Sequence, residues 1–141
     1  MIGILIVAHE TFGECLIRCA THVLGGPPPQ LTHIGIDPKD DPQAIVPEAR
    51  RLVQSLDSGA GVLVLTDIYG ATPCNIACQL LVPGRVEGVA GASLPMLMRA
   101  LTYRNEPLEA LVARAVSGGR DGVARMPCSD TEKCSIKKPK S

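Results

Sequence analysis

The stretch Ile2-Gly3-Ile4-Leu5-Ile6-Val7-Ala8-His9 decides the fold class of this chain. Its unbroken run of aliphatic, often β-branched residues is typical of a parallel strand that is buried on both faces. Thr11 and Glu14 follow at the spacing of a capping box, so each side chain is expected to accept a backbone N–H at the start of a helix. His9 is therefore expected in a strand-to-helix turn.

The rest of the chain repeats this alternation of strand and helix. Further strands are expected over residues 31–36, 61–66 and 86–90, and helices over residues 11–24, 42–56, 72–80, 93–101 and 107–116. Thr72 and Ser93 are expected to cap their helices, and Gly118-Gly119 is expected to end the last one. We predict an α/β fold, a doubly wound sheet with four parallel strands in the order 2-1-3-4.

Composition and charge limit the possible functions. The chain has 141 residues, 45% of them hydrophobic, which is enough for one domain with a core. Only Phe12, Tyr69 and Tyr103 are aromatic, so a surface that stacks nucleic-acid bases is not expected. Residues 1–126 carry ten Lys and Arg against twelve Asp and Glu, and residues 127–141 carry four Lys against two acids. This balance predicts no nucleic-acid partner.

Compartment and cysteine chemistry can also be predicted. No run approaches the roughly 18 apolar residues that span a membrane, and no basic segment precedes the first strand, so a cytoplasmic protein without membrane insertion is expected. The six cysteines are expected to be reduced. Cys15 with Cys19 and Cys74 with Cys78 have the i, i+4 spacing of metal ligands, but burial as small core residues is the favoured interpretation. No metal and no cofactor are expected.

Two of the strands are followed by an ionisable residue, His9 after the first and Asp67 after the third. In the order 2-1-3-4 these strands are neighbours, and ligands collect in the crevice where their following helices diverge. A carboxylate that accepts a hydrogen bond from one imidazole nitrogen fixes the tautomer and leaves the other nitrogen free to attack. His9 and Asp67 are therefore candidates for a nucleophile and its orienting group. The alternative is that both are ordinary hydrogen-bonded turn residues.

Helix N-termini at Thr11, Thr72 and Ser93 are expected around the same crevice. Their unpaired N–H groups favour an anion, phosphate above all, and Gly70 permits a close approach of the backbone. A histidine nucleophile in these surroundings, with no carboxylate cluster for a metal, suggests a transient phosphohistidine.

Three segments are specific only in combination: Ile4-Leu5-Ile6-Val7-Ala8-His9, Thr66-Asp67-Ile68-Tyr69-Gly70-Ala71-Thr72-Pro73-Cys74-Asn75 and Gly91-Ala92-Ser93-Leu94-Pro95-Met96-Leu97. In this order and at these spacings they resemble the IIA component of the mannose, fructose and sorbose class of the bacterial phosphoenolpyruvate-dependent sugar phosphotransferase system. The resemblance covers residues 1–126. Those residues would form a phosphotransferase system IIA domain, and residues 127–141 a flexible polar tail.

The resemblance implies a phosphotransferase in which His9 accepts a phosphoryl group from the phosphohistidine of the carrier HPr and passes it to a IIB component. Asp67 would hold the imidazole. The phosphoryl group would be bound by Thr72, Gly70, Ala71 and Ser93. The family fold also implies a short antiparallel fifth strand that is exchanged in a homodimer, and Gly122-Val123-Ala124-Arg125-Met126 is the segment that would form it.

The chain departs from the family pattern near the expected site. The usual Gly-Gly-Ser-Pro or Gly-Gly-Thr-Pro reads Gly70-Ala71-Thr72-Pro73, which adds a methyl group, and Ser93 replaces a frequent asparagine. Many members continue into a IIB domain, so a IIB partner is expected to act in trans. The alternative is a regulatory module whose His9 phosphorylation state controls binding to a kinase or transcription factor. A receiver-like domain phosphorylated on Asp67 is disfavoured, because only Glu10 offers an acid after the first strand.

Overall fold

The computed structural model describes residues 1–128 and contains one parallel sheet. Its strands are β1 (Gly3–His9), β2 (Leu31–Ile36), β3 (Val62–Thr66) and β4 (Val86–Ala90). They pair in the order β2-β1-β3-β4, so the predicted fold class and strand order are confirmed. Most of the expected polar tail, residues 129–141, lies outside the described residues.

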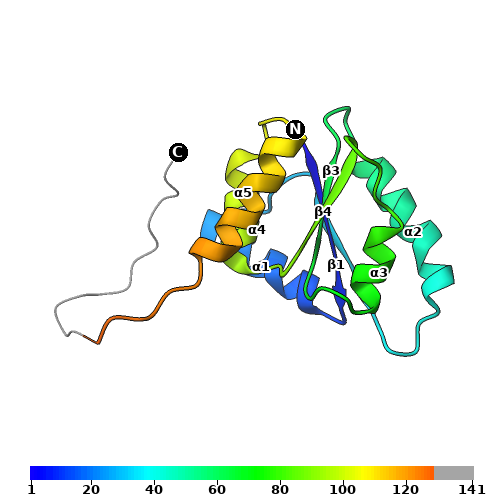
Figure 1. Ribbon diagram of the computed structural model, residues 1–141, viewed down its shortest axis with the longest axis horizontal. Helices are drawn as coiled ribbons and strands as arrows, with labels where there is room; N and C mark the ends of the chain where they lie inside the picture. The colour runs from blue at the N-terminus through cyan, green and yellow to red at the C-terminus, as the bar shows by residue number, and fades with distance from the viewer. Residues whose placement is uncertain (129–141) are drawn as a thin grey trace.

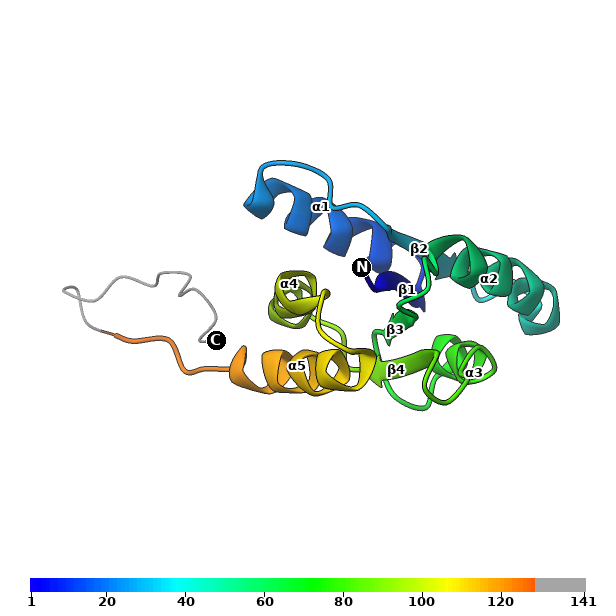
Figure 2. The same cartoon turned by 90° about the horizontal axis from the view of Figure 1, so that it is seen from above.

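Five helices, counted within residues 1–128, cover the two faces of the sheet (Figures 1 and 2). One face carries α1 (Phe12–Leu24), α4 (Leu94–Tyr103) and α5 (Leu108–Asp121), and the other carries α2 (Pro42–Leu56) and α3 (Thr72–Cys78). None of these helices is long and apolar enough to cross a membrane.

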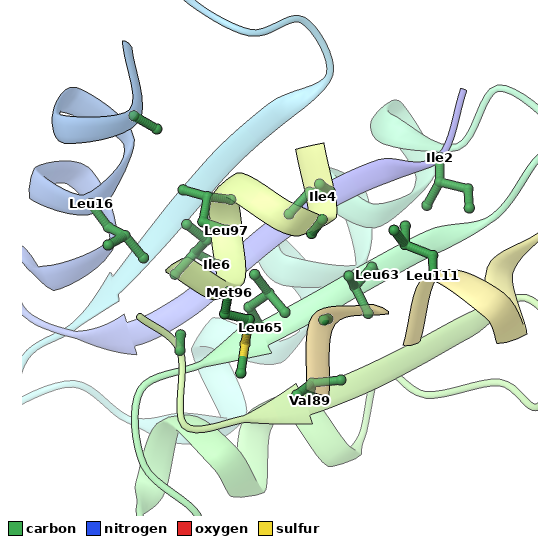
Figure 3. Packing of buried hydrophobic residues seen from close by; sticks show 14 of the residues in the cluster. Ile2, Ile4, Ile6, Leu16, Leu63, Leu65, Val89, Met96, Leu97 and Leu111 are labelled. Atoms are coloured by element: carbon green, nitrogen blue, oxygen red, sulfur yellow. The ribbon is translucent and has the colours of Figure 1, made fainter. Parts of the chain in front are cut away.

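Alternate residues of β1 belong to two different cores, which explains why the strand is apolar throughout. Ile4 and Ile6 pack with residues of α1, α4 and α5 (Figure 3). Leu5 and Val7 point to the opposite face and pack with residues of α2 and α3. All four side chains are fully buried, as expected for a strand with helices on both sides.

Of the three predicted capping residues, Ser93 is confirmed, Thr11 has the predicted position but not the predicted side-chain hydrogen bond, and Thr72 is wrong. Thr11 precedes α1, but its backbone (φ −96°, ψ 8°) is not extended and its side chain makes no capping hydrogen bond. Thr72 lies inside α3, because Ala71 already has the extended backbone (φ −91°, ψ 174°) from which that helix begins. Ser93 does cap α4, and its Oγ accepts a hydrogen bond from the N–H of Met96 at 3.3 Å.

The last helix does not end at Gly118-Gly119 but continues to Asp121. Both glycines lie where α5 approaches α4. A Cβ atom on Gly118 would lie 2.9 Å from Cβ of Arg99, and one on Gly119 would lie 2.8 Å from Cε of Met96. The close helix packing outweighs the poor helix propensity of the two glycines.

The cysteine prediction is only partly right. All five cysteines within residues 1–128 are free thiols. Cys74 is buried as expected, but Cys15, Cys19 and Cys78 are exposed. Residues 122–126, the expected fifth strand, form neither helix nor strand in the single chain, so their exchange in a dimer stays a prediction.

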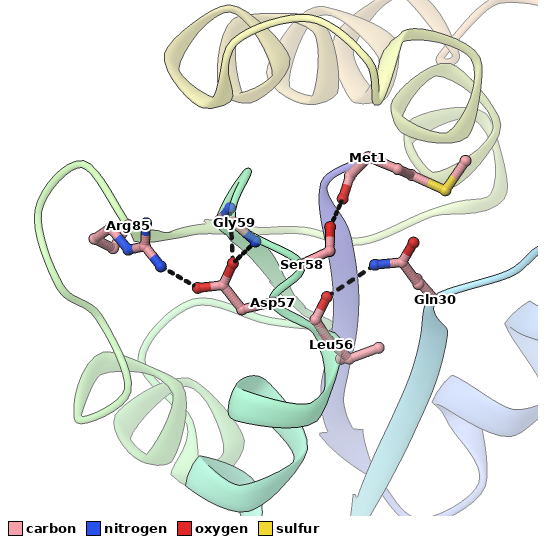
Figure 4. Close-up of polar contacts among 8 residues, drawn as sticks. Met1, Gln30, Leu56, Asp57, Ser58, Gly59 and Arg85 are labelled. Carbon is pink, nitrogen blue, oxygen red and sulfur yellow. Dashed lines mark hydrogen bonds and ion pairs between the residues drawn. The ribbon is translucent and has the colours of Figure 1, made fainter.

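Polar contacts hold together the edge of the sheet where the strands begin (Figure 4). Asp57 Oδ1 accepts hydrogen bonds from the N–H groups of Gly59 at 2.8 Å and Gly61 at 3.1 Å, and its Oδ2 lies 2.6 Å from Nη2 of Arg85. The hydrogen bond from Gly59, together with those from Gly61 and Arg85, holds the pKa of Asp57 below its usual value of 3.8 in spite of partial burial.

The buried side chain of Arg104 supports the same edge. Its Nε and Nη2 donate to the carbonyl oxygen of Ile2 at 3.0 and 2.8 Å, Nη2 also donates to Gln30 at 2.7 Å, and Nη1 donates to Pro29 at 2.6 Å. Burial lowers the pKa of Arg104. The end of α4 is thereby joined to the beginnings of β1 and β2.

We expect Asp57→Ala to lower the free energy of unfolding at pH 7 by about 1–3 kcal/mol, because three donors lose a charged acceptor. The folded-state pKa of Asp57 lies below the unfolded value of 3.8, so this contribution is complete above that value. It is lost as the pH falls through the folded-state pKa. Denaturant unfolding of the wild type and of Asp57→Ala at pH 7 and at about pH 3 measures the loss of unfolding free energy at each pH.

Asp121→Ala is the matched control, because Asp121 pairs with Arg99 but its side chain is 65% exposed. It should change the free energy of unfolding by less than about 0.5 kcal/mol. If Asp57→Ala lowered the free energy of unfolding equally at both pH values, the ionised carboxylate of Asp57 would not be the source of the stabilisation.

Candidate functional site

His9 is the last residue of β1, at the edge of the sheet opposite to the Asp57 and Arg104 contacts. Residues 2–8 are all buried, whereas the side chain of His9 is 47% exposed. The two cores fix the strand, and the strand presents its final side chain to solvent. A reactive group at this position is both anchored and accessible.

The predicted contact between His9 and Asp67 is confirmed. Nδ1 of His9 lies 2.7 Å from Oδ2 of Asp67, and the backbone N–H of His9 donates to the same oxygen at 3.1 Å. Asp67 directly follows β3, which pairs with β1 in parallel register, so both residues lie at the same edge of the sheet. One carboxylate oxygen therefore holds both the ring and the main chain of His9.

The second oxygen of Asp67 is also engaged. Oδ1 accepts hydrogen bonds from the N–H of Ile68 at 3.1 Å and from Oγ1 of Thr66 at 3.5 Å. Burial raises the pKa of Asp67, but the hydrogen bonds from the ring and main chain of His9, with the charge of the ring, outweigh burial and leave the pKa below 3.8. Asp67 is therefore an oriented, ionised acceptor at neutral pH.

This arrangement sets the chemistry available to the imidazole. A carboxylate can only accept, so Nδ1 of His9 carries the proton that it donates to Asp67. In the neutral ring Nε2 then has its lone pair free. A half-exposed imidazole of this kind can attack an electrophile such as phosphorus.

A surface cavity of about 440 Å³ adjoins His9. Thr72 lines it, so the structure places this predicted site residue beside the imidazole. The remaining lining residues come from the end of β2, the segment leading to α2 and the first residue of that helix: Ile36, Asp37, Pro38, Asp40 and Pro42.

Asp37 and Asp40 were missed by the sequence reasoning, although both follow β2, the other neighbour of β1. Oδ2 of Asp40 accepts a hydrogen bond from the N–H of Asp37 at 2.8 Å, and Oδ1 of Asp37 accepts one from the N–H of Lys39 at 2.9 Å. The rule that functional residues collect where parallel strands end could have found them.

The other predicted site residues lie at the same edge but outside the cavity lining. Gly70 is exposed and has φ +85°, a left-handed conformation that favours glycine, and Ala71 precedes α3. Ser93 is half-buried, and its Oγ is engaged in capping α4. The N–H of Ala92 donates to the carbonyl oxygen of Thr66, so the turn before α4 lies against the end of β3. Residues 1–128 contain no group of three or more His, Cys, Asp or Glu that could hold a metal ion.

A comparison with protein families identifies the chain. The family described as "PTS system fructose IIA component" matches residues 3–116, which is well over half of the sequence. The chain therefore belongs to this family of phosphotransferase system IIA components.

Characterised relatives agree with this assignment. The chain is 32% identical over 138 residues to the PTS system mannose-specific EIIAB component of Escherichia coli strain K12, a match that covers 94% of this chain and 42% of that protein. The chain thus spans less than half the length of this relative. It is also 27% identical over 105 residues to the PTS system sorbose-specific EIIA component of Lacticaseibacillus casei, covering 72% of this chain and 73% of that one.

Solved structures share the fold. The mannose/sorbose-specific IIA subunit from Enterococcus faecalis superposes with a TM-score of 0.81 at 20% identity, covering 93% of this chain and 98% of that one. The phosphotransferase system component EIIA from Streptococcus agalactiae gives 0.78 at 25% identity, covering 89% and 97%.

We expect Asp67→Asn to weaken the preference of the His9 ring for the Nδ1–H tautomer. A neutral amide has only one acceptor atom and cannot accept from the ring, the His9 N–H and the Ile68 N–H as the carboxylate does, so the proton is held less firmly on Nδ1 and the share of the Nε2–H tautomer rises. Imidazole ¹⁵N NMR of the neutral ring distinguishes the two tautomers. Asp37→Asn is the matched control, since Asp37 lines the cavity but accepts its hydrogen bond from Lys39. Unchanged ¹⁵N shifts in Asp67→Asn would show that Asp67 does not set the tautomer.

Proposed function

We propose that this protein is a phosphocarrier that accepts a phosphoryl group from phospho-HPr on His9 and passes it to a IIB component. The observation that carries the proposal is the contact of Nδ1 with Asp67 at 2.7 Å, because it leaves Nε2 of a half-exposed ring as the attacking atom. Membership in the IIA family and the similarity to a protein named EIIAB component support both the donor and the acceptor. Such a relay would take place in the cytoplasm.

The transfer step is an in-line displacement at phosphorus. The lone pair of His9 Nε2 forms the new N–P bond, the N–P bond of the HPr phosphohistidine breaks, and its electron pair returns to the HPr imidazole. The proton on Nδ1 stays in its hydrogen bond to Asp67, which also balances the positive charge that develops on the His9 ring. Transfer to IIB repeats the same exchange in the opposite sense.

Thr72 is the residue we assign to the phosphoryl oxygens, because it shares the cavity with His9 and is the first residue of α3. Gly70, with its left-handed backbone, and Ala71, which precedes α3, would offer backbone groups of the same turn to the phosphoryl group. Ser93 would contribute through the turn that it caps, since its Oγ is already bound to Met96.

We also propose a homodimer in which Gly122-Val123-Ala124-Arg125-Met126 is exchanged. Within the described chain β4 is an edge strand of the sheet, and besides β3 it pairs only with Val82, through an isolated bridge at Val86. Val123 and Met126 are 85% and 73% exposed, which is unfavourable for apolar side chains in a lone chain. Antiparallel pairing of this segment with β4 of a second copy would satisfy the strand edge and bury both residues.

Incubation with phospho-HPr should label the wild-type protein with an acid-labile, base-stable phosphoryl group. His9→Ala should lose the label completely, because the nucleophile is absent. His22→Ala is the matched control, since His22 is also exposed but lies on α1, and it should be labelled normally. Labelling that survives in His9→Ala would reject the proposal, and an alkali-labile adduct would point to Asp67 instead. Transfer onward to IIB, followed by loss of label, distinguishes a carrier from a regulatory module.

Light scattering tests the proposed exchange. The full chain should have twice the mass of one polypeptide, and a chain truncated after Asp121 should have the mass of one. Truncation after Met126 keeps the exchanged segment and should leave the dimer intact. A dimer that persists after the shorter truncation would contradict strand exchange.

A further inference from the structure

The residue after His9 has an unusual backbone. Glu10 has φ +46°, in the left-handed region that residues other than glycine rarely adopt. Its N–H donates to the carbonyl oxygen of Ile36 at 3.0 Å. The turn that follows His9 is therefore fastened to the end of β2 while it holds a strained conformation.

Gly35 of β2 is what makes this conformation possible. A Cβ atom on Gly35 would lie 2.1 Å from the carbonyl oxygen of Glu10 and 3.1 Å from its carbonyl carbon. Gly35 pairs with Ala8 in the regular parallel register, and its own φ is not left-handed. Glycine is thus required at position 35 by the approaching carbonyl group and not by the backbone of position 35 itself.

We propose that Gly35 is a positioning residue for His9. Its missing side chain leaves room over β2 for the carbonyl group of left-handed Glu10, so the main chain of His9 is not displaced from the position in which the imidazole reaches Asp67. The inference deepens the proposed function and rests on it for the role of the imidazole. It concerns how His9 is aimed, and Gly35 itself touches no phosphoryl group.

Two hydrogen bonds show how a change at position 35 would reach the ring. The N–H of His9 is bound to Oδ2 of Asp67 at 3.1 Å, and the next N–H along the chain is bound to Ile36 at 3.0 Å. The main chain of His9 is therefore held between β3 and β2. A methyl group at position 35 would force the carbonyl group of Glu10 to move. That movement is costly, because the colliding atom belongs to the backbone and not to a flexible side chain. The contact of 2.7 Å between the His9 ring and Asp67 then lengthens or loses its alignment.

Positions 10 and 35 are coupled by this geometry. Glycine at position 10 can rotate its peptide group at little cost and can move the carbonyl oxygen away from a side chain at position 35. A substitution at Gly35 that disturbs His9 should therefore be relieved by Glu10→Gly. A general loss of packing would not be relieved in this way.

The experiment compares Gly35→Ala, Glu10→Gly, the double variant and Gly26→Ala. Gly26 is the matched control, because a Cβ atom there meets nothing within 4 Å. Imidazole ¹⁵N NMR reports the ratio of the His9 tautomers. Initial rates of transfer over a range of phospho-HPr concentrations give kcat and KM. Resonances are assigned to His9 by their loss in His9→Ala.

Gly35→Ala should lower the ratio of the Nδ1–H to the Nε2–H tautomer about tenfold. It should also lower kcat roughly 10- to 100-fold with KM little changed, since orientation and not docking is affected. The double variant should recover most of both quantities, and Glu10→Gly and Gly26→Ala should resemble the wild type.

A folded Gly35→Ala protein with the wild-type tautomer ratio would overturn the proposal. So would a shift that Glu10→Gly does not reverse. If Gly35→Ala fails to fold, the double variant decides: a folded double variant with the wild-type ratio supports the proposal, and an unfolded one overturns it. Failure of the proposed function appears separately, as absence of transfer in the wild type while the tautomer ratios still follow the substitutions.

Discussion

The register of β1 between its two neighbours is the constraint on which the site depends. Ile4 and Ile6 face one core while Leu5 and Val7 face the other, so a shift by one residue would exchange every side chain between two differently shaped interiors. The register is therefore held by packing along the whole strand. The same packing fixes the position of His9, because His9 is the last residue of this strand.

The architecture was predictable because its signals are local in sequence. Apolar runs and helical periodicity predicted the four strands, the doubly wound fold class predicted their order, and the rule for parallel sheets brought His9 beside Asp67. Helix ends were predicted less well, because a cap depends on the backbone angles of one residue. Thr11 and Thr72 have suitable side chains, but neither has the backbone of a capping residue. Gly118-Gly119 suggested a helix end because glycine is common there. In the structure these glycines instead allow α5 to pack closely against Arg99 and Met96 of α4.

Other features depend on contacts between distant segments, which no local pattern contains. Gly35 resembles any glycine in a strand until the carbonyl of Glu10 is seen above it. Asp37 and Asp40 read as a polar turn, although that turn forms a wall of the cavity beside His9. The exposed cysteines of α1 show the same limit: their helical spacing is compatible with burial, and only the packing of α1 on the sheet decides which side they face.

The buried guanidinium of Arg104 has a consequence for how the chain can mature during synthesis. Its acceptors, the carbonyl oxygens of Ile2, Pro29 and Gln30, belong to the first part of the chain, whereas the donor comes at the end of α4. During synthesis these oxygens cannot receive their hydrogen bonds from Arg104 until residue 104 has left the exit tunnel of the ribosome. The edge of the sheet remote from His9 is therefore completed only after most of the domain has been synthesised.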